Sequence, residues 1–170
     1  KKEGLIEARV DKVRPAVEKI VTKMFNGQEK HLLANVDRLG PNDLHKVDEL
    51  LAALRSDNTA AVNEALKKTI ATFGKYAASD LDADGMIFNA VSERVLKYAA
   101  RTAAQKVQIL DETTGRAVKE GIRAALVEAQ VAGENIVDSS TRIMEAGIKN
   151  GMDIRRSRAV TIAQTETTAA

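Results

Sequence analysis

The segment Asp80-Leu81-Asp82-Ala83-Asp84-Gly85 carries the carboxylates best spaced for cation chemistry in this chain. Aspartates at positions 1, 3 and 5 with glycine at position 6 copy the first half of an EF-hand calcium loop. The loop then lacks its bidentate glutamate, because position 12 is Val91 and Glu93 lies two residues further on. We therefore predict an acidic linker between helices and keep a weak cation site of another type as the alternative.

Basic side chains gather at two places that suit phosphate or an acidic partner. One helix after the acidic linker has no acidic residue from 94 to 106 and four basic ones, namely Arg94, Lys97, Arg101 and Lys106. We expect no aromatic interleaving to support base stacking here, so a solvated helix face is favoured over a phosphate-binding one. Further on, Arg155, Arg156 and Arg158 either grip DNA or an acidic protein surface, or stay solvated just before a helix.

Catalytic and cofactor chemistry has little support in the sequence. His31 and His45 lie on separate predicted helices without the carboxylate spacing of a metal motif, and Asp48 near His45 fits an ordinary surface pair. Glu112 and Glu120 fall on predicted helix surfaces. No phosphate-binding glycine loop, nucleophile elbow or metalloprotease motif is present. We therefore expect no enzyme activity, no catalytic residue, no cofactor and no metal site.

Composition indicates a helical protein with an aliphatic core. Aromatic residues make up only 3% of the chain and hydrophobic residues 44%, so Ala, Leu, Ile and Val must fill the interior. The absence of cysteine excludes disulfides and thiolate metal sites. A formal net charge of +2 differs from the strongly basic balance of a dedicated nucleic-acid domain. No apolar run approaches the roughly 20 residues of a membrane span, so no membrane association is expected.

Apolar residues recur at helical spacing over nearly the whole chain, and no segment alternates as a strand does. We therefore predict an all-α fold, an elongated bundle of about six to seven helices. Pro15 is expected to break or kink the first helix. Through Asn26-Gly27, one long helix fits the pattern as well as two short ones. Pro41 is well placed to open the next helix.

Polar residues are expected to mark the other helix boundaries. Ser56-Asp57-Asn58 is predicted to cap one helix, Asp111 or Thr113 another, and Asn135 a third, with Gly133 ending the helix before it. Met152-Asp153-Ile154 is predicted to turn into a final helix. The chain is thereby divided into an N-terminal helical region at 1–79, an acidic linker at 80–87 and a second helical region at 88–170.

The final helix is expected to have one apolar face that is closed by a carboxylate. Ala159, Ile162, Ala163 and Glu166 recur at i, i+3, i+4 and i+7, so they share that face. A carboxylate in this position either reaches solvent or meets a cation, because burying it alone is unfavourable. The chain starts without Met and ends at Ala169-Ala170 without a capping residue, so we expect a fragment of a longer chain or a processed product.

This last segment resembles the hallmark of the Mu F-like minor head proteins of tailed phages, some of which are fused behind a portal protein. The family pattern runs roughly R-A-x-x-I-A-R-T-E-T. The positions that match it are Arg158, Ala159, Ile162, Ala163, Thr165, Glu166 and Thr167. Gln164 departs, since the family usually has Arg there. The order of Asp111-Glu112-Thr113-Thr114 and Gly133-Glu134-Asn135 upstream is also similar, so the resemblance covers residues 88–170.

The resemblance implies a structural minor head protein, located in the phage head interior or at the portal vertex and assembled in the host cytoplasm. It implies a role in head assembly and in DNA packaging or ejection. The implied partners are the portal protein and other head proteins, with a homo-oligomer and non-specific DNA contact also allowed. The motif positions from Arg158 to Glu166 are expected to be structural.

Two other hypotheses stay open at this point. The Mu F-like segment also occurs in chains where a helical adaptor delivers a downstream toxin or enzyme domain. A calcium-regulated helical protein is the third hypothesis, and it depends on the acidic segment that begins at Asp80.

Overall fold

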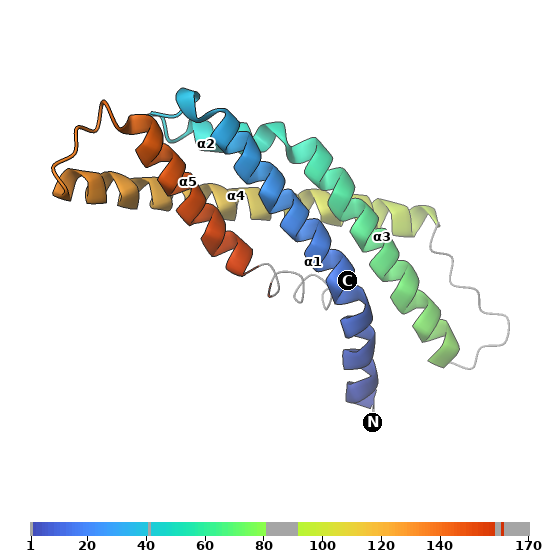
Figure 1. Ribbon diagram of the computed structural model, residues 1–170. Helices are drawn as coiled ribbons and strands as arrows, with labels where there is room; N and C mark the ends of the chain where they lie inside the picture. The colour runs from blue at the N-terminus through green and yellow to red at the C-terminus, as the bar shows by residue number, and fades with distance from the viewer. Residues whose placement is uncertain (1, 41, 81–91, 159–160, 162–170) are drawn as a thin grey trace. The chain divides into compact units, whose positions relative to one another are not determined.

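The computed structural model describes residues 2–40, 42–80, 92–158 and 161, and this part of the chain contains helices and no strand. Figure 1 shows α1 (Lys2–Ala34), α2 (Lys46–Ala53), α3 (Arg55–Asp80), α4 (Glu93–Val131) and α5 (Ser140–Ser157), with a short 3-10 helix η1 (Val36–Arg38) after α1. The predicted all-α class is confirmed. The described ranges hold five α-helices, fewer than predicted, because helices run through several expected boundaries.

The helices form two compact units. The first unit combines the beginning of α1 with most of α3 and the first part of α4, from residues 1–21 and 57–107. The second combines the end of α1, η1, α2, the rest of α4 and α5, from residues 22–56 and 108–158. The sequence-based division at 80–87 stays a prediction, since residues 81–91 lie outside the described part of the chain.

α1 is a single helix of 33 residues, so the predicted break at Pro15 is absent, whereas the alternative of a kink there stays a prediction. Proline lacks an N–H group to donate within the helix, but Val13 and Val17 on either side of it are both buried. Packing of an apolar face supplies most of a helix's stability in a folded protein, which explains why the interruption is tolerated. The helix also continues through Gly27, so one long helix is the correct alternative.

α4 is likewise continuous over 39 residues, so the predicted N-cap at Asp111 or Thr113 is wrong. Its buried residues recur at intervals of three and four along the helix. Apart from glycines, they are Ala99, Ala103, Val107, Leu110, Asp111, Thr114, Val118, Ile122, Ala125 and Ala129. Asp111 and Thr114 thus lie on the buried face of α4. In the sequence, polar residues at such positions fit the start of a helix as well as the buried face of a continuous one.

The end of α4 agrees with the sequence prediction at Gly133. This glycine has a φ of 71°, the left-handed conformation that favours glycine after a helix. Its N–H donates to the carbonyl of Gln130 at 3.1 Å, and the N–H of Glu134 donates to the carbonyl of Ala129 at 2.9 Å. These are the two hydrogen bonds of a Schellman motif.

Three other predicted boundaries are wrong. α3 begins at Arg55, so Ser56-Asp57-Asn58 lies within its first turn, because Leu54 ends α2 in a helical conformation that leads directly into α3. α5 begins at Ser140 instead of Asn135, whose side chain accepts a hydrogen bond from the N–H of Val137 in a turn. α5 also runs through Met152-Asp153-Ile154, since Met152 is fully buried and keeps the apolar face continuous.

Each unit contains a small aliphatic cluster. In the first unit the cluster joins α3 to α4 through Leu66, Ala99 and Ala103, with Val62 and Ile70 packed against them. In the second unit it joins α4 to α5 through Ala125, Ala129 and Ile143, with Leu126 and Ile136 beside them. Neither cluster includes an aromatic side chain, in agreement with the composition. No helix in the described ranges is both long and apolar enough to cross a membrane.

α4 and α5 approach each other backbone to backbone at three glycines, Gly121, Gly147 and Gly151. A β-carbon at Gly151 would lie 2.6 Å from the Cα atom of Val118 and 2.7 Å from the carbonyl oxygen of Ala117. Both are backbone atoms that cannot rotate away. A side chain at this position can therefore be accommodated only if the two helices separate.

We expect Gly151→Ala to lower the free energy of unfolding by about 1–3 kcal/mol, the usual effect of overpacking. Gly27→Ala is the matched control, because Gly27 also lies in a helix and its added β-carbon would meet nothing within 4 Å. There the better helix propensity of alanine should raise stability by roughly 0.5–1 kcal/mol. Urea denaturation measures both, and equal stability of the two variants would contradict the close crossing.

Candidate functional site

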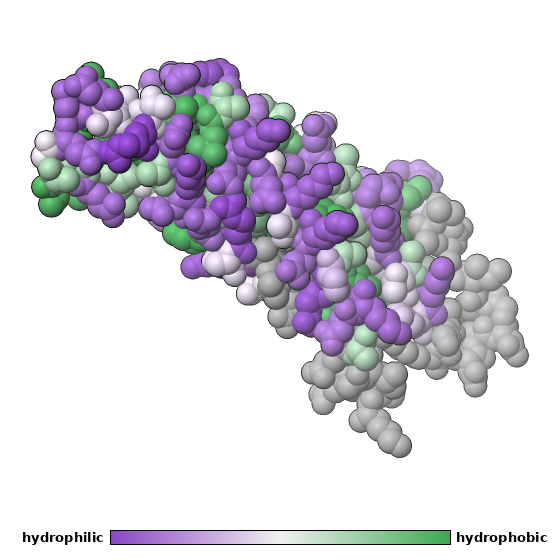
Figure 2. Space-filling model, viewed as in Figure 1, coloured by the Kyte–Doolittle hydropathy of each residue, from purple (hydrophilic) through white to green (hydrophobic). Residues whose placement is uncertain are grey.

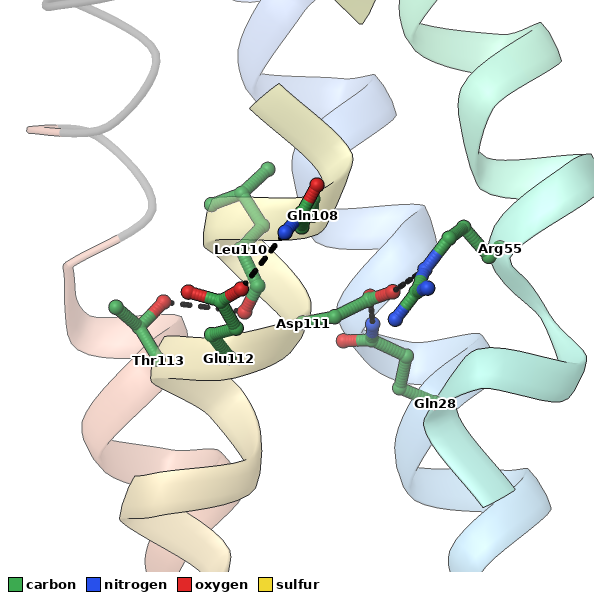
Figure 3. Close-up of polar contacts among 7 residues, drawn as sticks. All are labelled: Gln28, Arg55, Gln108, Leu110, Asp111, Glu112 and Thr113. Carbon is green, nitrogen blue, oxygen red and sulfur yellow. Dashed lines mark hydrogen bonds and ion pairs between the residues drawn. The ribbon is translucent and has the colours of Figure 1, made fainter. Parts of the chain in front are cut away.

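The second unit contains a buried carboxylate, Asp111, in the middle of α4, with only 3% of its side chain exposed. Gln28 of α1 donates from Nε2 to Oδ1 at 2.9 Å, and Arg55 at the start of α3 donates from Nε to Oδ2 at 3.1 Å. Figure 3 shows these two side chains meeting Asp111 from different helices. We call Gln28, Arg55 and Asp111 the Asp111 cluster.

Burial dominates the electrostatics of this cluster. It raises the pKa of the Asp111 carboxyl above its ordinary value of 3.8, and the hydrogen bonds from Arg55 and Gln28 offset only part of that rise. Arg55 keeps 47% of its side chain exposed, so its charge is partly solvated. Two buried atoms, Gln28 Oε1 and Thr114 Oγ1, have no hydrogen-bond partner in the described structure.

The geometry of the Asp111 cluster is suited to holding three helices together. Both carboxylate oxygens of Asp111 accept hydrogen bonds from the same chain, and the side chain is buried. A general base must come within hydrogen-bond reach of its substrate, which this position does not allow. The cluster therefore fastens α1 and the start of α3 to α4 within the second unit.

The three arginines at the end of α5 occupy three different environments. Arg155 is buried, and its guanidinium lies over the Phe25 ring at 5.4 Å from the ring centroid. Arg156 pairs with Glu29 of α1 and with Asp153. Arg158 follows the last turn as the exposed C-cap of α5. They are therefore not a single cationic patch.

Opposite pKa shifts follow from these environments. Burial lowers the pKa of the Arg155 guanidinium, and the positive charge of Arg158 lowers it further. Hydrogen bonds from Arg156 to Glu29 and Asp153 raise the pKa of the Arg156 guanidinium. Arg155 and Arg156 both hold α5 against α1 in the second unit, whereas Arg158 is exposed.

Most of the predicted family-motif positions lie outside the described residues. Only Arg158 is described, whereas Ala159, Ile162, Ala163, Thr165 and Glu166 lie outside the described residues. The structural role expected for these six positions stays a prediction. The calcium-like segment after Asp80 also lies outside the described part of the chain.

The histidines and surface carboxylates form no common site in the structure. The proposed surface pair of His45 and Asp48 is replaced by another contact, since Asp48 Oδ2 accepts a hydrogen bond from Lys119 Nζ at 2.5 Å. Glu112 accepts one from Gln108 Nε2 at 3.0 Å (Figure 3). Within the ranges that the structure describes, no group of three or more His, Asp or Glu side chains is placed to hold a metal ion.

The basic face of α4 differs from the sequence expectation in one respect. Arg94, Lys97 and Arg101 are exposed as predicted, and Lys97 pairs with Glu93 at 2.6 Å. Tyr98 lies among them with 50% of its side chain exposed. It stands four residues after Arg94 and three before Arg101, so it shares their face. The expectation of no aromatic interleaving was wrong.

Sequence reasoning also missed Gln28 and Asp111 as partners. One signal was available, because Asp111 and Thr114 continue the three- and four-residue spacing of the apolar face of α4, and Gln28 lies on the buried face of α1 between Phe25 and Leu32. That spacing predicts burial. It does not reveal which buried polar side chain pairs with which, since Gln28 and Asp111 are 83 residues apart.

Comparison with known proteins identified no relative of this chain. No protein-family model, no curated protein and no solved structure matches this chain. The resemblance to Mu F-like head proteins therefore depends on the sequence segment alone.

We expect Asp111→Asn to remove a pH-dependent loss of stability. A carboxyl whose pKa is raised by folding binds its proton more tightly in the folded state. Ionising it therefore lowers the free energy of unfolding as pH rises from 3.8 through the raised pKa, with no further change above it. The stability of the wild type relative to the variant should fall across this window. Denaturation at several pH values from below 3.8 to neutral measures the difference.

Carboxylates that the wild type and the Asp111→Asn variant both contain do not affect this comparison. Asp43 and Glu64 have lowered pKa values because of Lys46 and Lys67 respectively, so their effect on stability has the opposite sign. Both proteins contain them, and their contributions cancel in the difference. If the stability of the wild type relative to the variant instead rises with pH, the ion pair with Arg55 has a larger effect on the pKa of Asp111 than burial has.

Proposed function

We propose that this chain is a structural minor head protein of a tailed phage, located in the head interior or at the portal vertex. It would act in head assembly and in DNA packaging or ejection, with the portal protein and other head proteins as partners. The observation that carries the proposal is the ordered match to the family pattern at Arg158, Ala159, Ile162, Ala163, Thr165, Glu166 and Thr167.

The described helices support a structural role for the segment just before this motif. The motif begins at Arg158, the C-cap of α5. Gly147 and Gly151 bring α5 against α4, and Arg156 pairs with Glu29 of α1. These contacts hold α5, the helix that directly precedes the motif, against α4 and α1. Binding through helical surfaces is the mechanism that fits this arrangement.

The Asp111 cluster also favours a structural role over catalysis. It is the buried carboxylate with a raised pKa in the second unit, the kind of group that often marks an active site. Its two oxygens are occupied by Gln28 and Arg55, so its chemistry is used in holding helices together. We therefore propose binding, and not an enzymatic reaction, as the activity of this chain.

We expect the 170-residue chain to co-purify with the portal protein of the same genome as a complex of defined stoichiometry. Size-exclusion chromatography with light scattering at low and high salt is the measurement. Arg158→Glu should weaken the complex at least about tenfold, because it reverses the charge at a motif position. Lys149→Glu is the matched control, since Lys149 is exposed on α5 and lies outside the motif.

A folded chain that forms no complex with the portal protein would overturn this proposal. The helical adaptor of a downstream toxin or enzyme domain would then be the better interpretation, and the complete gene product should encode such a domain after Ala170. Equal weakening by Arg158→Glu and Lys149→Glu would remove the motif from the interface.

A further inference from the structure

The first part of α4 presents an exposed surface of Arg94, Tyr98 and Arg101, which we call the Arg-Tyr-Arg row. The spacing of four and three residues puts all three on one face, over about 10 Å of helix. Among the described residues neither arginine has an ion-pair partner, and Tyr98 is 50% exposed. Tyrosine and arginine, together with tryptophan, are enriched among the side chains that contribute most to binding at protein interfaces.

The last turns of α4 and the turn after it present a second surface, which we call the valine tip. Val127, Val131 and Val137 are 58%, 84% and 83% exposed, more than any other large hydrophobic side chain in the described ranges, of which Ile109 at 55% is the next most exposed. Val127 and Val131 share one face of the helix. Figure 2 shows green, hydrophobic surface at this end of α4 among purple, hydrophilic residues.

Acidic side chains border the valine tip. Glu128 lies three residues before Val131 on α4, and Asp138 follows Val137 directly; both are exposed. Within the described ranges neither carboxylate has a cationic partner, whereas Glu134 nearby is already paired with Arg142. The tip thus combines three exposed valines with two unpaired negative charges.

We propose that the valine tip of one copy of this chain binds the Arg-Tyr-Arg row of a second copy. The two surfaces are complementary in charge, since two unpaired arginines face two unpaired carboxylates. They are also complementary in chemistry, because the ring of Tyr98 offers an apolar surface to the valines. Each surface is exposed in the single chain, where the carboxylate of Asp138 accepts a hydrogen bond from Asn135 Nδ2 at 2.6 Å but has no cationic partner among the described residues.

A second copy accounts for both surfaces at once. A nucleic acid could engage the two arginines and Tyr98 through phosphate contact and stacking, but it would leave the valines uncovered. The contact joins two different surfaces, so it is heterologous and extends to a ring or an open chain of copies. This inference does not depend on the phage assignment, and the two can fail separately.

The association should be weak and sensitive to salt. The surfaces are small compared with a standard stable interface, and their charges are solvent-exposed and therefore screened. Sedimentation velocity and light scattering over a range of concentrations should show assembly of the 170-residue chain at low salt and its loss at high salt.

Charge-reversal variants test the pairing directly. Arg94→Glu with Arg101→Glu, and separately Glu128→Lys with Asp138→Lys, should each weaken assembly at least about tenfold. An equimolar mixture of the two variants should assemble again, because each variant keeps one native surface that its partner can bind. Lys68→Glu with Lys75→Glu is the matched control for the arginine variant, because it changes the net charge by the same amount on exposed residues of α3, and it should assemble as the wild type does.

Circular dichroism confirms that each variant is folded, and Arg94→Gln with Arg101→Gln replaces the reversal if it is not. A wild-type chain that stays monomeric at every concentration overturns the proposal, as does a mixture that fails to reassemble. Single-stranded DNA binding that disappears in the Arg94→Glu, Arg101→Glu variant, without self-association of the wild type, also overturns it and assigns the row to nucleic acid.

Discussion

The second unit depends on the hydrogen-bond requirements of one buried carboxylate. A carboxylate removed from water is strongly unfavourable unless hydrogen bonds replace its hydration. Asp111 meets this requirement with Gln28 from α1 and Arg55 from α3. Because both donors must stay within about 3 Å of its oxygens, the register of α1 and of the start of α3 against α4 is restricted. A purely apolar contact between the same helices would tolerate sliding.

The remaining packing of this unit follows from the shortage of large side chains. With few aromatic residues, contacts between helices depend on small ones, and at Gly121, Gly147 and Gly151 the backbones of α4 and α5 nearly touch. The buried aromatic Phe25 packs under the guanidinium of Arg155. Arg156 adds an ion pair to Glu29 on the same helix as Phe25. The end of α5, just before the segment that resembles the Mu F-like pattern, is thus held by polar as well as close-packed contacts.

Some charged side chains of this protein form ion pairs and hydrogen bonds between its helices, whereas others are exposed on the surface. Asp111, Arg55, Arg156 and Glu29 are engaged within the second unit. Arg94, Arg101, Glu128 and Asp138 are exposed without ion-pair partners among the described residues. Exposed, unpaired charges beside exposed apolar groups are typical of interaction surfaces.

The sequence alone determined the features that depend on neighbouring residues. The all-α class and the end of α4 near Gly133 follow from helical spacing and from the conformational freedom of glycine. The continuity of α4 through Asp111, the start of α5 at Ser140 and the separate environments of Arg155 and Arg156 were decided by tertiary structure. An acidic residue after an apolar run fits a helix start as well as a buried partner. Only the position of Gln28, 83 residues away in the chain, distinguishes the two, because the stability of a buried carboxylate depends on which donors the fold brings to it.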